Sequence, residues 1–427
     1  MTKISNVYAR EVLDSRGKPT VEVEITCDDG GIGRAIVPSG ASTGQAEALE
    51  LRDASAERYD GQGVLQAVAN VNDVIAPTLL SQDAADQSAI DSILLQCDDS
   101  PQKSQLGGNA LLGVSLATAH AAAASKRVPL HQHVNDLFSA TPHLPTSSTP
   151  RPALPLPMTN MISGGLHAGG NLDFQDVLIM SVGASDYRTG LEWIVRVYRR
   201  LGELLCDAGF EGRLVGDEGG YGPALGSNRQ AVEFVVRATE AAKLRPGEDV
   251  TIALDVAATH FVQEDGSYRL VTEQDTTLTS SQMTDRLEEW VTDFPITSIE
   301  DGLAEEDWEG WREMTKRLGD KTALVGDDLF TTNESRIRRG IELGVGNAVL
   351  IKVNQIGTLT ETFCAISAAR QAGYGIVVSA RSGETEDTTI ADLAVGVAAD
   401  HIKIGSIVRS ERLAKYNQLL RIAESLR

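Results

Sequence analysis

Six charged residues follow short apolar runs in the second half of the chain, three carboxylates first and then three cations. They are Asp255, Glu300, Asp327, Lys352, Arg381 and Lys403. Oxygen ligands without histidine or cysteine favour a hard divalent cation, Mg²⁺ or Mn²⁺, over zinc. The cations that follow would then bind an anionic substrate. Arg381 with Ser382 suits a phosphate group, because a guanidinium can donate two parallel hydrogen bonds to it.

The apolar runs before these residues predict the strands that position them. The runs cover residues 250–254, 296–299, 323–326, 348–351, 375–378 and 401–404. A helical stretch follows each run, and strands that are apolar throughout and alternate with helices indicate a parallel sheet. Together with the preceding elements, six such units fit a closed (β/α) barrel, whose active site is expected where the strands end.

The first third of the chain has a different pattern, typical of an α+β domain. Apolar and polar residues alternate over 21–25 and 32–37 around a Gly30-Gly31 turn, which predicts an antiparallel hairpin with one buried face. The side chains expected on that face are Val21, Val23, Ile25, Ile32, Ala35 and Val37. An alanine- and leucine-rich segment over 106–126 predicts a helix.

A proline-rich segment over 141–157 predicts an extended linker between two domains, because proline disrupts helices and central strands. We therefore expect a capping domain over residues 1–140 and the barrel over 141–427. The chain ends in a predicted amphipathic helix with an apolar side of Leu413, Leu419, Leu420, Ala423 and Leu426.

Three glycine-rich loops add candidate functional groups. Residues 39–44 could bring backbone amides and the Ser39 hydroxyl close to an anion or a metal, although a mobile surface turn explains this loop equally well. His167 lies between glycines in residues 164–170, and Glu218 lies in a similarly open loop over 216–220. A histidine in such a setting is more often functional than structural.

The overall composition limits the class of protein. The chain has 427 residues and a formal net charge of −22, which argues against a nucleic acid or an anionic membrane as partner. The four cysteines form no C-x-x-C pair, and no apolar run is long enough to span a membrane. We expect a cytoplasmic enzyme with a small anionic substrate.

Together these motifs resemble the enolase family over essentially the whole chain. The resemblance rests on Ser39-Gly-Ala-Ser-Thr-Gly44, Gly216-Asp-Glu-Gly-Gly220, Leu254-Asp-Val-Ala-Ala258, Ser298-Ile-Glu-Asp301, Gly326-Asp-Asp-Leu329, Lys352-Val-Asn-Gln-Ile-Gly357, Arg381-Ser-Gly-Glu-Thr-Glu-Asp387 and the tail from Arg409 to Leu420. It implies a small α+β cap on an eight-stranded barrel whose first strands run in an unusual order. Relatives are usually dimers or larger homo-oligomers.

The resemblance also implies roles for individual residues. Asp255, Glu300 and Asp327 would bind a structural Mg²⁺, and Ser39 would close over a second Mg²⁺ that arrives with the substrate. Lys352 would be the base, with a pKa lowered by Lys403 and the metals. The other implied catalytic residues are Glu218, Lys403, His167 and Asp176, and the implied substrate-binding residues are Arg381, Ser382, Ser39, Ala41, Gln175 and Ala380.

Some positions depart from the family pattern. Ala380 replaces a histidine, Asp176 replaces a longer glutamate, and Gly302 replaces a proline, which is expected to loosen the loop beside Glu300. Lesser departures are Leu166 in place of serine and His260 in place of glutamate.

Three hypotheses about function remain open from the sequence. The smaller side chains at Ala380 and Asp176 favour a paralogue with an altered substrate. It would resemble the enzyme of phosphinothricin-type pathways that forms carboxyphosphonoenolpyruvate from a phosphonoformyl donor and a phosphoglycerate- or enolpyruvate-type substrate. An ordinary enolase that converts 2-phosphoglycerate to phosphoenolpyruvate is the first alternative, and a non-catalytic binding protein is the second. Retention of Lys352 and Glu218 argues against the last, because binding alone needs neither group.

Overall fold

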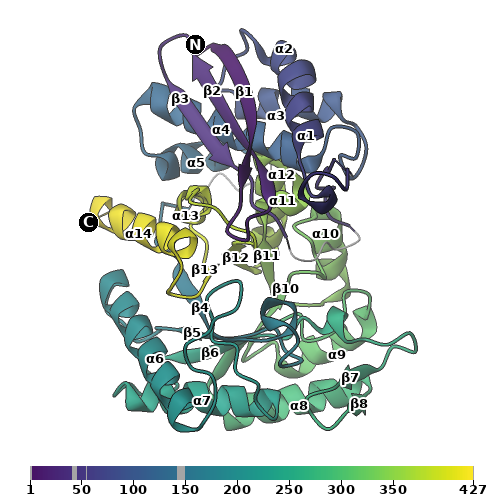
Figure 1. Cartoon of the computed structure of the whole chain (residues 1–427), viewed down its shortest axis with the longest axis vertical. Helices are drawn as coiled ribbons and strands as arrows, with labels where there is room; N and C mark the ends of the chain where they lie inside the picture. The colour runs from purple at the N-terminus through teal and green to yellow at the C-terminus, as the bar shows by residue number, and fades with distance from the viewer. Residues whose placement is uncertain (1, 41–45, 54, 142–149, 427) are drawn as a thin grey trace.

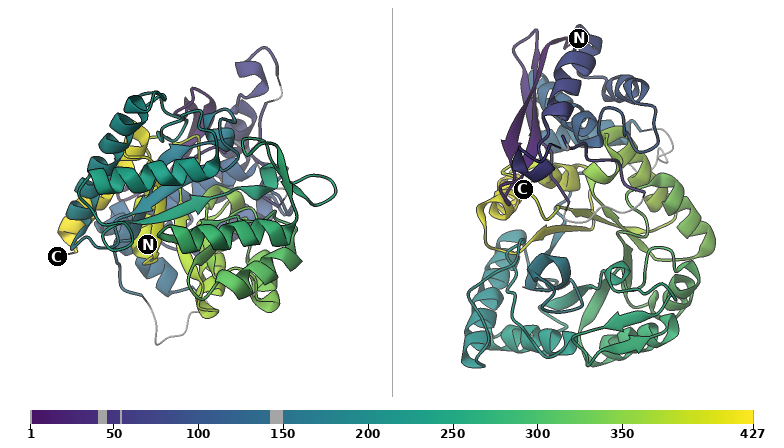
Figure 2. Two further views of the ribbon diagram at one scale, coloured as in Figure 1. Left: turned by 90° about the horizontal axis from the view of Figure 1, so that it is seen from below. Right: turned by 45° about the vertical axis from the view of Figure 1, so that its right-hand side comes forward.

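The computed structural model describes residues 2–40, 46–53, 55–141 and 150–426, and it divides into two stacked parts. A three-stranded sheet with its helices lies above a closed barrel in the view of Figure 1. Figure 2 shows from two further directions that the sheet and helices cover one side of the barrel. The expected architecture, an eight-stranded α/β barrel with an N-terminal strand and helix domain, is confirmed.

The N-terminal sheet is antiparallel, in the order β1-β2-β3. Its strands are β1 (Ile4–Leu13), β2 (Pro19–Cys27) and β3 (Ile32–Ile36). The predicted hairpin corresponds to β2 and β3, with Val23 opposite Ala35 and both buried. The expectation for Ile32 was wrong: its side chain is 57% exposed, because the inward alternation of β3 begins at Gly33.

The helices of this domain cover one face of the sheet. They are α1 (Leu65–Ala69), α2 (Ala76–Leu79), α3 (Gln87–Cys97), α4 (Gly108–Lys126) and α5 (Leu130–Ser139), with a π-helical turn at Asn70–Ile75 between the first two. The predicted helix over 106–126 corresponds to α4, which is buried along nearly its whole length against β2 and β3. Glycines allow this close packing: a Cβ at Gly33 would lie 2.1 Å from the backbone of Ala117 and of Ala121 in α4.

The barrel closes in the order β10-β11-β12-β13-β4-β5-β6-β9. Its strands are β4 (Leu156–Ser163), β5 (Asp176–Met180), β6 (Thr251–Asp255), β9 (Ile296–Glu300), β10 (Ala323–Gly326), β11 (Ala348–Ile351), β12 (Gly375–Ser379) and β13 (His401–Gly405). All six predicted strands are present, and β4 and β5 complete the ring. A small hairpin, β7 (Tyr268–Leu270) with β8 (Thr276–Leu278), lies outside it.

One strand of the barrel, β5, runs against all the others. It pairs antiparallel with both β4 and β6, because the chain returns directly from β4 through residues 164–175 without a crossover helix. As a result the first residue of β5, Asp176, is the register partner of the last residue of β6, Asp255. The reversed strand therefore brings its starting residue to the end of the barrel where the parallel strands finish.

The remaining helices surround the barrel. They are α6 (Tyr187–Asp207), α7 (Asn228–Ala241), α8 (Ser280–Asp293), α9 (Trp308–Leu318), α10 (Glu334–Leu343), α11 (Val353–Ile356), α12 (Leu359–Gln371), α13 (Thr389–Gly396) and α14 (Ser410–Ser425). Apolar side chains fill the interior of the barrel itself, among them Met158, Leu178, Val325, Leu350 and Val377. The interior is thus a packed core, as expected for this architecture. No helix among the described residues is long and apolar enough to cross a membrane.

The predicted apolar side of the last helix was wrong. Leu419 is buried, but Leu426 is 40% exposed, and the buried face of α14 carries mainly polar side chains.

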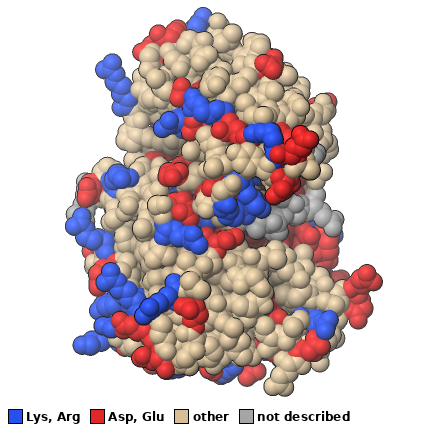
Figure 3. Space-filling view, in the orientation of Figure 1, with Lys and Arg blue, Asp and Glu red and all other residues tan. Residues whose placement is uncertain are grey.

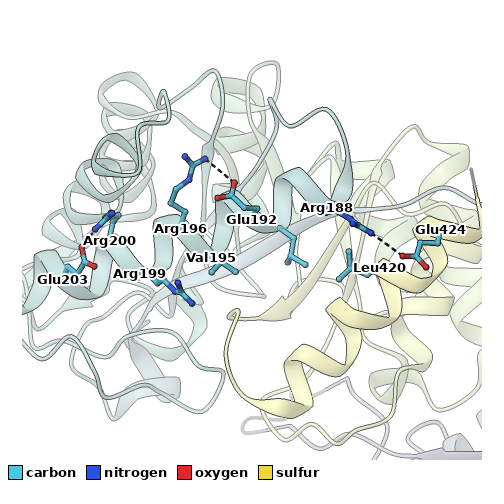
Figure 4. A pocket seen from close by; sticks show the side chains of 10 residues that line it. Arg188, Glu192, Val195, Arg196, Arg199, Arg200, Glu203, Leu420 and Glu424 are labelled. Atoms are coloured by element: carbon cyan, nitrogen blue, oxygen red, sulfur yellow. Dashed lines mark hydrogen bonds and ion pairs between the residues drawn. The ribbon is translucent and has the colours of Figure 1, made fainter.

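Leu420 faces an open groove between α6 and α14, which Figure 4 shows with Arg188 of α6 paired to Glu424 of α14 at 3.4 Å. Lys and Arg atoms also gather over this region at the left of Figure 3. The groove shares no residue with the pocket at the strand ends.

The two domains are joined by buried hydrogen bonds as well as by packing. The Asn135 side chain of α5 donates to the Gly396 carbonyl of α13 at 2.8 Å, and the backbone N–H of Thr360 donates to Asp91 of α3 at 2.9 Å. These contacts place the N-terminal domain on the side of the barrel formed by α11, α12 and α13.

We expect Gly33→Ala to destabilise the chain by about 2 kcal/mol or more, because the added methyl group overlaps the α4 backbone, which cannot move independently. Gly226→Ala is a suitable control, since its nearest neighbouring atom would lie 3.6 Å away. Chemical denaturation of both variants measures the difference. Equal midpoints for the two variants would contradict the packing described for β3 and α4.

Candidate active site at the barrel mouth

Three carboxylates converge at the ends of adjacent strands. Asp255 ends β6 and Glu300 ends β9, and these two residues are partners in the parallel register. Asp327 follows β10, in which Val325 is the register partner of Glu300. All three side chains are buried. The register of the sheet therefore brings together residues that are up to 72 positions apart in the sequence.

Two lysines reach these carboxylates from other strands. Lys403 Nζ lies 2.6 Å from Asp255 Oδ2 and 2.8 Å from Glu300 Oε2, although β13 is on the opposite side of the barrel from β9. Lys352, which follows β11, donates to Asp327 Oδ2, and Gln355 Nε2 donates to Asp327 Oδ1 at 3.0 Å. Both ammonium groups are thus already engaged by predicted metal ligands.

Two further carboxylates lie beside this cluster. Asp301, Asp327 and Asp328 each offer an oxygen within 4.8 Å of the others. Asp301 accepts the backbone N–H groups of Asp327 at 3.0 Å and Asp328 at 2.7 Å, so it fixes the turn that carries Asp327. The adjacent Gly302 is buried, and a Cβ there would lie 3.0 Å from a Met314 sulfur. The expectation that Gly302 loosens this loop stays a prediction.

The carboxylates outnumber the cations that contact them, and their pKa values reflect this. Burial and the charge of Asp255 raise the pKa of Glu300 to about 8, against the opposing effect of Lys403. Burial and Asp327 likewise raise the pKa of Asp328 to about 7. A cluster of oxygen donors with surplus negative charge, and with no histidine or cysteine, fits a hard divalent cation.

The expected lowering of the Lys352 pKa includes the charge of two metal ions, and the protein groups alone do not produce it. Burial acts to lower the pKa of its ammonium group, but the charge of Asp327 outweighs that effect and the net shift is upward. Sequence patterns suggested Lys403 as a cationic neighbour, and its charge does act to lower the pKa of Lys352. They could not reveal that an Asp327 oxygen would lie directly against the ammonium group.

His167, Asp176 and Glu218 form a second cluster across the pocket. Asp176 accepts from the Ser163 hydroxyl at 2.7 Å and from His167 Nδ1 at 2.8 Å, while His167 Nε2 lies 3.7 Å from Glu218. Burial acts to lower the pKa of His167, but Glu218 and Asp176 raise it to about 9. Burial acts to raise the pKa of Glu218, but His167 and Arg412 lower it to about 2. The imidazolium is therefore the proton-bearing group of this cluster at neutral pH.

The third part of the site is the loop after β12. Arg381 Nη1 donates to Glu47 Oε2 at 3.0 Å and to Asn354 Oδ1 at 2.9 Å, so the N-terminal domain takes part in orienting it. The Ser382 hydroxyl accepts from Arg16 Nη1 at 3.2 Å. Neither Arg16 nor Glu47 was predicted, because only the docking of the two domains brings them here.

Ser39 is positioned differently from its predicted role. Its backbone forms a two-hydrogen-bond antiparallel bridge with Gly383, at 2.8 and 2.9 Å. Its hydroxyl donates to Glu50 at 3.0 Å and accepts from Arg52 at 3.0 Å, and so it is directed away from the carboxylate cluster. The predicted substrate residue Ala41 lies outside the described residues.

Most predicted residues line one pocket. Those that do are His167, Gln175, Glu218, Asp255, Asp327, Lys352, Ala380, Arg381, Ser382 and Lys403. Glu300 and Asp176 lie directly behind it, bonded to Lys403 and His167 respectively. Leu166 and His260 also line the pocket, and the Leu166 side chain is 53% exposed. The pocket thus gathers residues of β6, β12 and β13 and of the loops that follow β4, β6, β9, β10, β11 and β12, with Glu218 from the loop after α6.

Asp176→Asn should lower the pKa of His167 from about 9. Because Glu218 remains and also favours the protonated ring, the decrease should be smaller than if both acidic neighbours were removed. Because the folded-state pKa lies above the ordinary value near 6.5, the associated stability is present below about pH 6.5 and is lost as the pH rises through about 9. NMR titration of the His167 ring measures the shift. An identical titration curve in the variant would show that Asp176 does not hold the proton there.

Comparison with known families agrees with this geometry over nearly the whole chain. The family model described as the N-terminal domain of enolase matches residues 4–134. The model described as the C-terminal TIM barrel domain of enolase matches residues 151–427. With both domains matched, and with the acidic strand ends of the barrel facing two lysines, the chain belongs to the enolase family.

Proposed function

We propose that this chain is a magnesium-dependent enzyme that stabilises an enolate next to a carboxylate and forms an enolpyruvate phosphorus ester. Our specific proposal is the formation of carboxyphosphonoenolpyruvate from a phosphonoformyl donor and a phosphoglycerate- or enolpyruvate-type substrate, as in phosphonate natural-product biosynthesis. The observation that supports it is the clustering of Leu166, His260 and Ala380 around one pocket.

Asp255, Glu300 and Asp327 are the residues that would hold Mg²⁺, and their all-oxygen donor set suits this ion. Bound there, Mg²⁺ would supply positive charge that offsets the negative charge developing on the substrate carboxylate. Mn²⁺ has the same preference for oxygen ligands and could substitute. A second ion near Ser39 stays a prediction, since the Ser39 hydroxyl bonds Glu50 and Arg52.

The other roles in the reaction would be carried out by side chains of the chain itself. Lys352 would take the proton next to the substrate carboxylate once its ammonium group has lost its own proton. Lys403 would neutralise charge from the opposite side of the barrel. Arg381 and Ser382 would bind the phosphorus group, and the imidazolium of His167 would be the group that can donate a proton on the far rim.

Altered specificity is supported by where the departures from the family pattern lie. Leu166, His260 and Ala380 are far apart in sequence, yet all three line the pocket. Ala380 immediately precedes Arg381, so a methyl group replaces an imidazole beside the phosphorus-binding end. Asp176 is fully engaged with Ser163 and His167. Three of the departures lie in the lining, and the metal-binding carboxylates expected there and both lysines are retained, which favours a different substrate over loss of catalysis.

Ordinary enolase activity is the second candidate. It is favoured by the complete set of carboxylates, both lysines and Glu218 in the same pocket. The two candidates share the chemistry at the carboxylate end of the substrate and differ at its phosphorus end. A direct comparison of substrates therefore separates them.

We expect Mg²⁺ to raise the melting temperature of the chain, since a ligand at 100 times its dissociation constant stabilises a folded protein by about 2.7 kcal/mol. Asp255→Asn should remove most of this shift. The exposed residue Asp320 provides the control, and Asp320→Asn should leave the shift intact. Calorimetry with and without Mg²⁺ measures it. A full shift in Asp255→Asn would place the ion elsewhere.

With 2-phosphoglycerate and Mg²⁺ we expect slow turnover, and at least a tenfold gain in the double variant Ala380→His with Asp176→Glu. The absorbance of phosphoenolpyruvate reports the rate. Adding Lys352→Met to the double variant should abolish the gain, which shows that it arises at this site.

Carboxyphosphonoenolpyruvate formation is detected by ³¹P NMR after incubation with an activated phosphonoformate. A rate with 2-phosphoglycerate that is typical of housekeeping enzymes would overturn the altered-substrate proposal and leave ordinary enolase activity as the function.

A further inference from the structure

The last helix directs charged side chains into the barrel wall. The residues of its first two turns that are buried are Glu411, Arg412, Lys415 and Tyr416. The Arg412 side chain is 0% exposed. Arg412 does not line the pocket, although its charge helps to lower the pKa of the lining residue Glu218.

The guanidinium of Arg412 joins the ends of two barrel strands. Nη1 donates to the backbone carbonyl of Arg381 at 2.7 Å and to that of Ile404 at 3.1 Å, and Nη2 donates to the carbonyl of Ser382 at 2.6 Å. Arg381 and Ser382 form the phosphorus-binding pair, and Ile404 directly follows Lys403. One planar group therefore links the backbone after β12 to the end of β13, two neighbouring strands that are also joined by the Ala380 N–H donating to the Lys403 carbonyl at 2.8 Å.

A second observation places Arg412 beside the loop that carries Glu218. The N–H of Ser406 donates to the Glu218 carbonyl at 2.8 Å. Gly405 lies between them with φ near +105°, and a Cβ there would be 2.9 Å from the Arg412 side chain and 3.0 Å from the Glu218 carbonyl oxygen. Only glycine leaves room for the guanidinium so close to Glu218.

Stability alone is a poor explanation for this arrangement. Among the described residues, Arg412 forms an ion pair only with Glu411, whose carboxylate oxygen lies 3.7 Å from Nε. Neither of these two atoms has a hydrogen-bond partner there. A buried cation without a bonded carboxylate costs desolvation energy that an apolar side chain would avoid. The guanidinium instead fixes three backbone carbonyls beside the pocket.

We propose that Arg412 is a positioning residue that holds the Arg381–Ser382 backbone at a set distance from Lys403, so that one anionic ligand can contact both. The proposal rests on the proposed function, in which Arg381 and Ser382 bind the phosphorus group. It assigns to α14 a part in ligand binding, although α14 contributes no side chain to the pocket.

The test compares Arg412→Lys with Arg370→Lys. Arg370 is a matched control, because its guanidinium also donates to two backbone carbonyls, those of Val397 and Ala398, away from the pocket. Calorimetric titrations measure the binding of Mg²⁺ alone, of phosphoenolpyruvate with Mg²⁺, and of inorganic phosphate with Mg²⁺. Melting temperatures of both variants are recorded alongside.

Arg412→Lys should keep the Mg²⁺ affinity within about twofold and weaken phosphoenolpyruvate and phosphate at least tenfold, since lysine keeps the charge and loses the planar three-way contact. Arg370→Lys should change none of the three affinities by more than about twofold. Parallel loss of Mg²⁺ and phosphoenolpyruvate binding, or equal effects in both variants, would show a merely structural role and overturn the proposal.

Two further measurements distinguish a failure of this inference from a failure of the proposed function. If Arg412→Lys does not fold, Arg412→Gln takes its place and is judged by the same affinities, because its amide can still donate to two carbonyls. If the wild-type chain binds phosphate but not phosphoenolpyruvate, the proposed function fails while the phosphate titrations still test Arg412. If it binds neither, both proposals are wrong.

Discussion

Surplus negative charge at the ends of β6, β9 and β10 is the constraint on which the rest of the active site depends. Buried carboxylates are costly unless cations or hydrogen-bond donors compensate them. Here Lys403 contacts Asp255 and Glu300 from across the barrel, and Lys352 contacts Asp327. These cations compensate the negative charge only in part, and the raised pKa of Glu300 reflects what remains. A divalent cation and an anionic ligand would complete this balance together, which is the electrostatic condition for stabilising a dianionic enolate.

Barrel topology determines which groups face that charge. Because β5 runs against its neighbours, Asp176 begins where Asp255 ends, and the loop between β4 and β5 brings His167 to the same rim. The proton-bearing imidazolium then lies across the pocket from Lys352. The loop after β12 is supported from outside the barrel: Glu47 orients Arg381 from the N-terminal domain, and Arg412 fixes the following backbone from α14. Chemistry at the centre thus relies on parts of the chain that never enter the pocket.

The departures from the family pattern have a consistent location in this arrangement. Ala380, Leu166 and His260 line the pocket without contributing to the charge balance, whereas the carboxylates and lysines that carry it are all present. Substitutions in the lining change the shape that a ligand must have and leave the electrostatic machinery in place. The proposed change of substrate needs this pattern, in line with the general rule that function depends on the site more than on the fold.

The sequence by itself determined the six parallel strands, the charged residues at their ends and the family, because apolar runs and their spacing are local properties of the chain. It also placed the carboxylates Asp255, Glu300 and Asp327 correctly at strand ends. It did not predict the exposure of Ile32, the buried face of α14 or the direct contact of Lys352 with Asp327. Only the tertiary structure decided these features, together with the contacts of Arg16, Glu47 and Arg412. The reason is that each depends on which distant segments come into contact when the barrel closes and the N-terminal domain docks.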